Sequence, residues 1–146
     1  MKLETQVETI NVMLDQGAYM PEKAHAADAG YDLRTPVRTV VHPHDSVTID
    51  TGVHIDIPRG YTGFLKSKSG LNVNHDLTGE GVIDSGYTGS IRVKLYNHSG
   101  QMHIFEAGDK IIQLVILPVA RGFDLKLTDS FRETERGDGG FGSTGR

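Results

Sequence analysis

Apolar and polar residues alternate with a period of two along much of the chain. The pattern is clear in residues 46–58 (SVTIDTGVHIDIP), 90–97 (SIRVKLYN) and 123–127 (FDLKL). Successive side chains of a strand point to opposite faces, so this alternation predicts β-strands with one buried face. No long stripe with the i, i+3, i+4 spacing of a helix is present. Only residues 69–76 (SGLNVNHD) predict a short helical turn.

Turn-forming residues interrupt these runs at short intervals, at Pro58-Arg59-Gly60, Ser85-Gly86, Ser99-Gly100 and Gly108-Asp109. Short strands separated by such turns predict an all-β fold, namely a sandwich, a jelly roll or a small barrel. The run IIQLVIL within residues 110–117 does not alternate, so this strand is expected to be covered on both faces. A subunit interface can supply the second cover in a chain of this size.

Length and charge narrow the function classes. The 146 residues suit one domain with a real core, and the net charge of −4 argues against a polynucleotide-binding protein. A nucleotide remains possible because it needs only a local group of cations and backbone donors. The chain has no cysteine, which excludes disulfides and thiolate metal sites. The polar N-terminus and the short apolar stretches predict a cytoplasmic protein with no membrane partner.

Five glycine-containing segments carry the candidate chemistry: DAGYDLRT (28–35), KSKSGLN (66–72), GVIDSGYTG (81–89), GDKIIQL (108–114) and RGDGGFGSTGR (136–146). Most have a structural explanation when each is taken alone. The Ser-Gly pair in KSKSGLN can form a nest of N–H groups for an anion, but it also suits a solvated loop. Asp84 suits a general base, although aspartate commonly opens a β-turn. Gln113 can bind a ligand or simply bond the backbone.

Two other features lead to opposite predictions about function. His42 and His44 lie two residues apart with Pro43 between them, which predicts a solvated edge rather than a metal site. The C-terminal segment is harder to explain as a disordered terminus. Its glycines would let the ring of Phe141 close over a flat ligand, while hydroxyl and N–H groups nearby hold phosphate oxygens. We therefore expect a β domain at residues 1–131 and a mobile lid at residues 132–146.

In this order, the five segments resemble the five signature motifs of the trimeric dUTP diphosphatases (dUTPases). AGYDLRT is similar to the first motif, SKSGLN to the second, EGVIDSGYTGSI to the third, GDKIIQLVI to the fourth and RGDGGFGSTG to the fifth. The resemblance spans residues 28–145. It implies a jelly-roll subunit, a homotrimer with three active sites at subunit boundaries, and Mg²⁺-dependent hydrolysis of dUTP to dUMP and pyrophosphate.

The resemblance also implies roles for individual residues. Asp84 would activate the attacking water, and Tyr87 would pack under the deoxyribose and exclude a 2′-hydroxyl. Asp32 would position waters around a Mg²⁺ ion held mainly by the triphosphate. The uracil edge would be read by a hairpin and the strand that returns from it, with the residues Thr78, Gly81, Val82, Ile83 and Arg92.

Phosphate oxygens would be held from two directions. One group lies in the second and fourth motifs: Lys68, Ser69, Gly70 and Gln113. The other would close from another subunit: Arg136, Phe141, Gly142, Ser143 and Thr144, with Phe141 over the uracil. Two positions depart from the family pattern, because Lys68 and Lys110 stand where arginine is usual. Lysine lacks the bidentate fork of arginine, so Lys68 offers a phosphate only a point charge. Lys110 is expected to form an ion pair within the scaffold.

Two alternatives accompany this hypothesis. A dCTP deaminase, alone or combined with dUTPase activity, shares the fold and trimeric plan and would need a proton-shuttling carboxylate beside the base, for which Glu80 is the candidate. A nucleotide-responsive regulatory protein of the phage type would use ordering of the tail as a switch. The complete third and fifth motifs favour the hydrolase.

Overall fold

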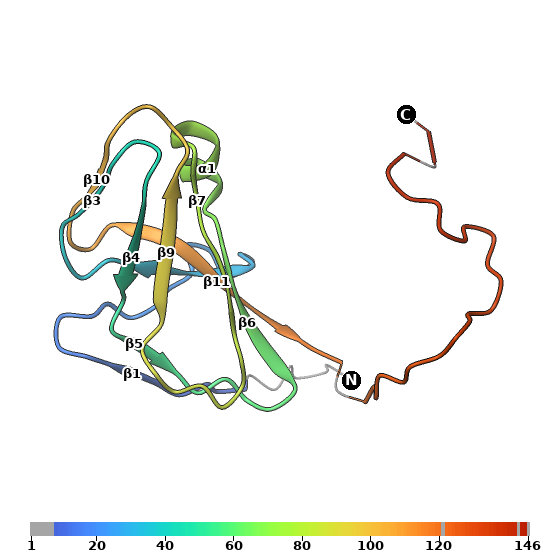
Figure 1. Cartoon of the computed structure of the whole chain (residues 1–146). Helices are drawn as coiled ribbons and strands as arrows, with labels where there is room; N and C mark the ends of the chain where they lie inside the picture. Colours follow the sequence, from blue (N-terminus) through green and yellow to red (C-terminus); the bar gives the residue numbers. More distant parts are fainter. Residues whose placement is uncertain (1–7, 121, 143, 146) are drawn as a thin grey trace.

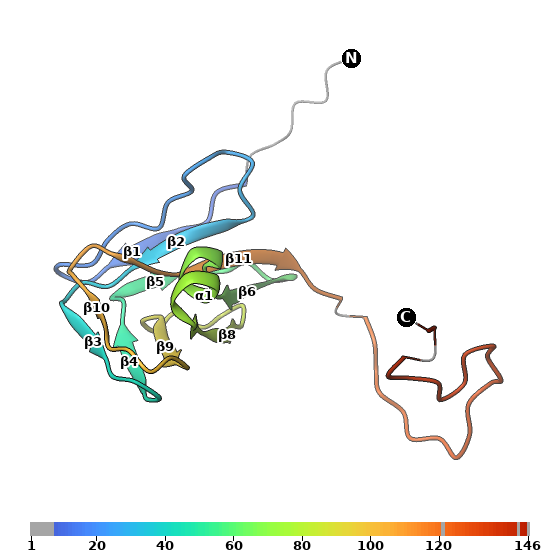
Figure 2. The same cartoon turned by 90° about the horizontal axis from the view of Figure 1, so that it is seen from above.

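The computed structural model describes residues 8–120, 122–142 and 144–145 (Figures 1 and 2). Within these residues the chain forms eleven short strands and one helix. In chain order they are β1 (Val12–Leu14), β2 (Gly30–Arg34), β3 (Thr39–Val41), β4 (Ser46–Asp50), β5 (Val53–Ile55), β6 (Tyr61–Lys66), α1 (Ser69–His75), β7 (Leu77–Thr78), β8 (Glu80–Ile83), β9 (Arg92–Asn97), β10 (His103–Phe105) and β11 (Lys110–Pro118).

The strands pair into four small antiparallel sheets that together enclose one core (Figure 1). The largest has the order β2-β11-β6-β8, the next has the order β4-β9-β7, and β1-β5 and β10-β3 form two-stranded ribbons. Neighbours such as β2 and β11 are far apart in sequence, as expected for a barrel closed by long-range pairing. The prediction of an all-β, jelly-roll-like subunit is confirmed.

Strand alternation builds the core. Along β9 exposed and buried positions alternate without exception, and Val93 and Leu95 point inward. They meet apolar side chains of the other sheets, including Leu33, Ile112 and Leu114, each of which is fully buried. Each such side chain contributes about 1.5–3 kcal/mol on burial. The core therefore fixes the register of the strands that carry the candidate site.

The alternating run at residues 46–58 is not one strand. It breaks at Thr51-Gly52, where Gly52 has a φ of 68°, and continues as β5 in a different sheet. The hydroxyl of Thr51 stabilises this corner, because it donates to the carbonyl of Ile91 at 2.6 Å and accepts from the N–H of Val53 at 3.2 Å. A period of two continues through the corner, so the pattern alone could not reveal it.

The two-sided cover expected for the 110–117 strand is present over only part of β11. Ile111, Ile112 and Leu114 are buried between β2 and β6, but Leu117 near the end of the strand is 47% exposed. The strand expected at residues 123–127 is not formed in the single chain. Phe123, Leu125 and Leu127 there are 81%, 99% and 95% exposed.

The segment after β11 leads away from the barrel and ends in the tail (Figures 1 and 2). We call residues 122–131 the apolar arm, because its large side chains are exposed and apolar. The boundary at residue 131 between domain and lid stays a prediction.

The predicted helical turn is confirmed as α1, which ends at Asp76 in the left-handed conformation with a φ of 54°. No helix in the described ranges has the length and apolar character required to cross a bilayer. His42 and His44 lie between β3 and β4 with exposed side chains, as expected for a solvated edge. Among the described residues no group of three or more histidine or acidic side chains is arranged to hold a metal ion.

Candidate active site

The best-defined charged group of the protein is built around Asp32, and we call Asp32, Lys68 and Lys110 the Asp32 cluster. The side chain of Asp32 on β2 is only 9% exposed, and the ammonium groups of both lysines contact its carboxylate. Lys68 contacts Oδ1, and Lys110 contacts Oδ2 at 3.1 Å. The ion pair expected for Lys110 is present. Burial alone would raise the pKa of Asp32, but the hydrogen bonds and charges of the two lysines hold it below its ordinary value.

The Asp32 cluster carries a net charge of about +1 when its three groups are ionised. The side chains of Lys68 and Lys110 remain 26% and 37% exposed, so their ammonium groups can turn toward an incoming anion. Lys68 directly precedes Ser69 and Gly70 at the start of α1. A Cβ at Gly70 would meet no heavy atom within 4 Å, so a ligand can approach this backbone closely. The structure therefore brings Asp32, Lys68, Ser69 and Gly70 together.

The lowered pKa of Asp32 predicts how stability depends on acid. Its ionised form is favoured by folding, so its contribution is present above the unfolded pKa of about 3.9 and is lost as pH falls through the folded pKa. Urea unfolding measured from neutral pH downward should show a steeper acid loss in the wild type than in Asp32→Asn. The exposed Asp56 gives the control, and Asp56→Asn should keep the wild-type slope. Equal slopes in the wild type and Asp32→Asn would contradict the prediction.

Gln113 joins the cluster through strand register. It lies on β11 opposite Asp32 of β2 and Lys66 of β6, and its amide donates to the carbonyl of Ser67 at 3.0 Å. A Cβ at Gly30 would lie 2.5 Å from Oε1 and 2.9 Å from Cβ of Gln113. Gly30 is therefore required for the Gln113 side chain to pack against β2. The sequence showed Gly30 only as part of a turn entering a strand.

Gly30→Ala should push Gln113 out of place. The added methyl group meets the root of the Gln113 side chain as well as its tip, so rotation of the amide does not relieve the overlap. We expect a loss of about 1–3 kcal/mol in the free energy of unfolding, measured with denaturant. Gly100→Ala is the matched control, because nothing lies within 4 Å of a Cβ there. A variant as stable as this control would contradict the proposed packing.

The segment from β7 to β8, two strands that belong to different sheets and are joined at Gly79, is fastened to the same end of β6. The hydroxyl of Ser67 accepts from the N–H of Gly79 at 3.0 Å and donates to its carbonyl at 3.2 Å. A side chain at Gly79 would meet Ile112 and the carbonyl of Lys94 at 2.9 Å, so the segment fits only with glycine there. Sequence reasoning missed Ser67, because its role depends on a partner twelve residues away.

An open cleft of about 830 Å³ is lined by residues of this segment, of the end of β6 and of β11. Its polar lining includes Lys66, Ser67, Thr78, Gly79, Glu80 and Gln113. Thr78 also contacts Nε2 of His98 at 2.7 Å. Farther along β8, Gly81 packs against Leu65, Val82 is 62% exposed and Ile83 is buried. The predicted base-reading residues thus follow the edge strand from the cleft toward Asp84.

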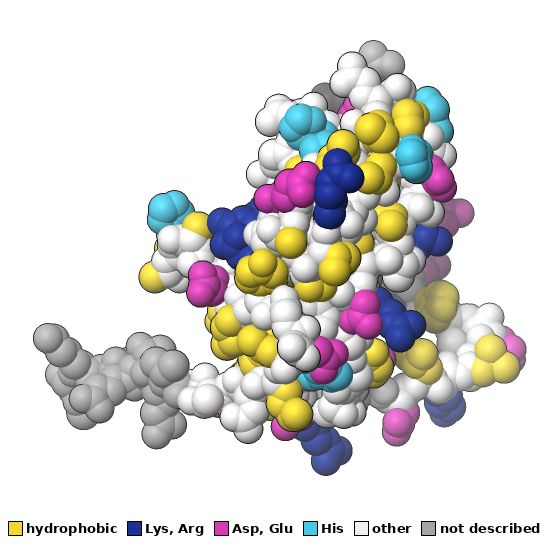
Figure 3. All heavy atoms as spheres, turned by 90° about the vertical axis from the view of Figure 1, so that its left-hand side faces the viewer, with side chains coloured by type: hydrophobic (Ala, Val, Ile, Leu, Met, Phe, Trp, Pro, Cys, Tyr) yellow, Lys and Arg dark blue, Asp and Glu magenta, His cyan; other side chains and the backbone are white. Residues whose placement is uncertain are grey.

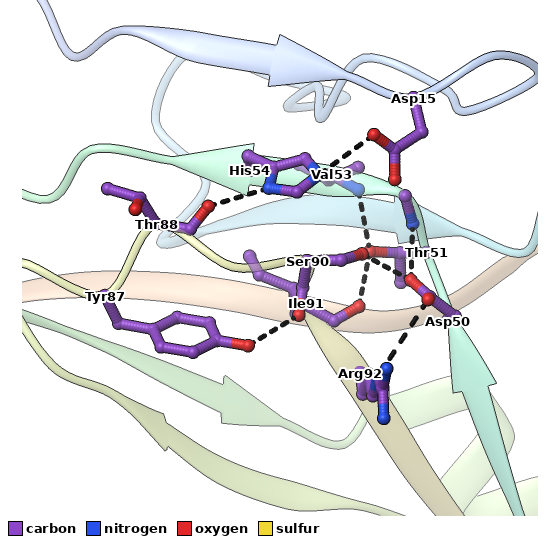
Figure 4. A network of polar contacts seen from close by, with 11 residues as sticks. Asp15, Asp50, Thr51, Val53, His54, Tyr87, Thr88, Ser90, Ile91 and Arg92 are labelled. Carbon is purple, nitrogen blue, oxygen red and sulfur yellow. Dashed lines mark hydrogen bonds and ion pairs between the residues drawn. The ribbon is translucent and has the colours of Figure 1, made fainter.

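Asp84 follows the last residue of β8 with an exposed side chain. Its carbonyl accepts from the N–H of Tyr87 at 3.2 Å, which closes a turn in which Gly86 has a φ of 84°. Tyr87 folds back over Gly89, where a Cβ would lie 2.6 Å from the phenol oxygen. The phenol hydroxyl donates to the carbonyl of Ser90 at 2.9 Å (Figure 4). The turn therefore presents a carboxylate and an oriented aromatic ring together.

One chain does not bring the Asp32 cluster and Asp84 together. Glu80 pairs with Lys66 beside Gln113, whereas Ile83 pairs with Gly63 in the middle of β6. Four residues of extended chain separate Glu80 from Asp84, which is about 13 Å. Arg92 lies at the Asp84 end, and its Nε is 3.9 Å from the carboxylate of Asp50. The predicted site residues thus form two groups on one chain.

The predicted lid residues form a third group. Arg136 donates from Nε to the carbonyl of Gly139 at 2.7 Å, within the tail itself. Phe141 is fully exposed with a φ of 41°, and Gly142 and Thr144 are also exposed. Ser143 lies outside the described residues. The tail lies away from the barrel in both views of the fold (Figures 1 and 2).

The fold and these groups define an all-β protein with a cationic, anion-accepting cluster and a separate carboxylate–tyrosine turn. The dUTPase family model matches residues 16–145, and the chain therefore belongs to the dUTPase family. The deoxyuridine 5′-triphosphate nucleotidohydrolase of Escherichia phage T5 is 38% identical over 145 residues, covering 93% of this chain and 98% of the phage protein. The protein of that name from Thermobifida fusca is 40% identical over 136 residues, covering 90% and 75%.

Solved structures show the same relationship. The dUTPase of Staphylococcus bacteriophage 80alpha, with dUpNHpp, has a TM-score of 0.86 and 32% identity, covering 96% of this chain and all of that one. A point variant of the dUTPase from phage phi11 of S. aureus, described with a structural Mg(II) ion, has a TM-score of 0.78 and 31% identity, covering 85% and 99%.

Proposed function

We propose that this protein is a dUTP diphosphatase that hydrolyses dUTP to dUMP and pyrophosphate. This reaction supplies dUMP and limits the incorporation of uracil into DNA. The observation that carries the proposal is the Asp84–Tyr87 turn, which exposes a carboxylate beside an oriented ring within a chain of the dUTPase family. The proteins it resembles are named for the same reaction.

The residues divide the chemistry between them. Water is a weak nucleophile at neutral pH, and the exposed carboxylate of Asp84 can take its proton during attack, which contributes typically about 10²–10⁴-fold to rate. The ammonium groups of Lys68 and Lys110, with the open backbone at Ser69 and Gly70, neutralise charge on the phosphates. Gln113 holds a phosphate oxygen or the water from its position beside the cluster. Lys68 serves as a point charge rather than a bidentate grip.

Base and sugar selection follow from the segment of β7 and β8 and from the Asp84–Tyr87 turn. Fixed main-chain donors and acceptors from Thr78 to Ile83, with Arg92 nearby, distinguish uracil from cytosine. The ring of Tyr87 packs under the deoxyribose and leaves no room for a 2′-hydroxyl. Because the ring lies against Gly89, its position is set by the backbone of its own turn.

The donors near Asp32 suit a Mg²⁺ ion that arrives with the triphosphate. Mg²⁺ usually keeps several waters and takes one or two carboxylates together with substrate phosphates. Asp32 is the carboxylate of its cluster, and the described residues hold no larger acidic group for a resident ion. Asp32 would hold waters of such an ion once the lysines turn to phosphate. The ion would supply further neutralisation of the phosphate charge.

The separation of the two groups supports a homotrimer with shared sites. In this arrangement the Asp84 turn of one copy meets the Asp32 cluster of a second, and the tail of another copy closes the site as a lid. The apolar arm supports it as well, because Phe123, Leu125 and Leu127 remain exposed in one chain and need a partner surface. Residues 132–146 form the lid, with Phe141 over the uracil and Arg136, Gly142, Ser143 and Thr144 at the phosphates.

The remaining partners are small molecules. On the face shown in Figure 3, basic side chains are interspersed with acidic and apolar ones, which does not suit a polynucleotide. We place the protein in the cytoplasm, where dUTP arises. A deaminase is not favoured, because Glu80, its candidate proton shuttle, is exposed and pairs with Lys66 at 3.0 Å.

Pyrophosphate release from dUTP, dTTP, dCTP and UTP, with and without Mg²⁺, tests the function. dUTP with Mg²⁺ should be hydrolysed far faster than the other three. Ammonia release from dCTP would instead support the deaminase. Absence of pyrophosphate release from dUTP would refute the proposal.

A further inference from the structure

The backbone beneath the Tyr87 ring is held at two points by residues outside the five motif segments (Figure 4). Tyr87 rests on Gly89 and bonds to the carbonyl of Ser90, so residues 88–90 form the seat of the ring. Any displacement of this seat displaces the ring. The contacts that fix the seat therefore decide where the aromatic face lies.

One of these points is His54 on β5. Its Nδ1 lies 2.7 Å from the carbonyl oxygen of Thr88, and its Nε2 lies 3.0 Å from Oδ1 of Asp15, just after β1. The imidazole thus bridges a neighbouring ribbon to the first residue of the seat. In Figure 4 the ring lies between these two oxygens.

Both partners of His54 are acceptors, since a carbonyl oxygen and an ionised carboxylate have no proton to donate. A neutral imidazole carries one N–H group and can satisfy only one of them. The protonated imidazole carries two and satisfies both. Deprotonation of His54 must therefore cost one of the two contacts, and the nitrogen left bare faces an oxygen lone pair.

The second point is Asp50 at the end of β4. Its carboxylate accepts from the hydroxyl of Ser90 and from the N–H of Gly52 at 3.0 Å. Asp50 makes no hydrogen bond to His54, so protonation of His54 acts on these two hydrogen bonds only through its charge. The seat therefore has one permanent fastening at Ser90 and one proton-dependent fastening at Thr88.

We infer that His54 is a positioning residue for Tyr87, and that its protonation makes the discrimination between dUTP and UTP depend on pH. The inference rests on the proposed function, because it gives Tyr87 the role of sugar gate. His54 touches neither substrate nor reacting atoms in this arrangement. It acts through the backbone of residues 88–90.

The charged groups around His54 support this assignment. Asp15 faces the ring directly, Asp50 lies farther off on β4, and Arg92 of β9 is directed to Asp50 at 3.9 Å. The carbonyl of Thr88 raises the pKa of His54 most, partial burial lowers it, and Asp15 and Asp50 raise it, so the pKa lies above its ordinary value. The fastening is complete below about pH 6.5 and is lost as pH rises through the folded pKa.

The experiment is the ratio of kcat/KM for dUTP to that for UTP across about pH 5.5–9, the range in which a histidine titrates. Titration of the general base affects both substrates alike and cancels in the ratio. The wild-type ratio should fall about fivefold as pH rises, the change that one typical hydrogen bond gives. His54→Gln should hold the low ratio at all pH values. Asp15→Asn should move the midpoint to lower pH, which a merely structural role would not do.

Two controls complete the test. His42→Gln, at an exposed histidine between β3 and β4, should keep the wild-type profile. The backbone amide of Gly89, followed by NMR without substrate, should titrate with the His54 ring. Hydrolysis of dUTP with a flat ratio and an unresponsive Gly89 overturns the inference and leaves the proposed function intact. No dUTP hydrolysis at all overturns the proposed function and, with it, the sugar-gate role on which the inference depends.

Discussion

Asp84→Asn is expected to lower kcat for dUTP by about 10²-fold or more while nucleotide binding persists. Asparagine keeps the size of the side chain and suits a turn as well as aspartate, so the turn closed at Tyr87 should remain. The amide cannot accept a proton from water at neutral pH. Steady-state turnover together with calorimetric affinity for a non-hydrolysable dUTP analogue measures both halves of the prediction.

Asp56→Asn is the matched control for this change, because Asp56 is another exposed carboxylate close after a strand. It should retain wild-type turnover. Near-normal turnover in Asp84→Asn would remove Asp84 from the role of general base. Loss of analogue binding together with turnover would assign Asp84 to binding instead.

Mixing two inactive variants is expected to restore activity. One is Asp84→Asn, and the other is truncated after Glu135, which removes the ligand-facing part of the proposed lid from Arg136 onward but keeps the apolar arm. In random 1:1 trimers a site is intact when its Asp84 comes from a truncated copy and its lid from an Asp84→Asn copy. About one quarter of sites meet both conditions, so activity should recover to about a quarter of the wild-type value.

The mixture must be prepared by unfolding and refolding the two variants together. Light scattering should give about three times 15.9 kDa, and mass spectrometry should show mixed trimers. Each variant refolded alone should stay nearly inactive. Mixed trimers without recovered activity would mean that Asp84 and the lid of one site come from the same copy.

The sequence predicted the parts of the site that are local. The Asp84 turn and the short helix after Lys68 follow from residues close together in the chain. The all-β fold was predicted from the period-two alternation, because that alternation is the same for almost any arrangement of strands. These features depend little on which strand lies beside which.

What the sequence could not predict depends on register and on long-range contacts. Gly30 is needed only because β2 lies beside Gln113, and Ser67 matters only because β6 ends beside Gly79. His54 looked like any polar residue of an alternating run until the corner at Gly52 placed it next to Thr88. The expected strand at 123–127 needs a partner edge, which one chain does not offer to it.

In the proposed trimer the apolar arm would also set the order of events when the protein folds. The barrel closes from contacts within one chain, whereas Phe123, Leu125 and Leu127 are exposed there and, in that trimer, would be buried only after another folded copy is met. Secondary structure should therefore return with first-order kinetics, while activity returns later at a rate that rises with protein concentration. Until that encounter each barrel exposes the apolar arm. Aggregation through this exposed apolar surface therefore competes with assembly when the protein concentration is high.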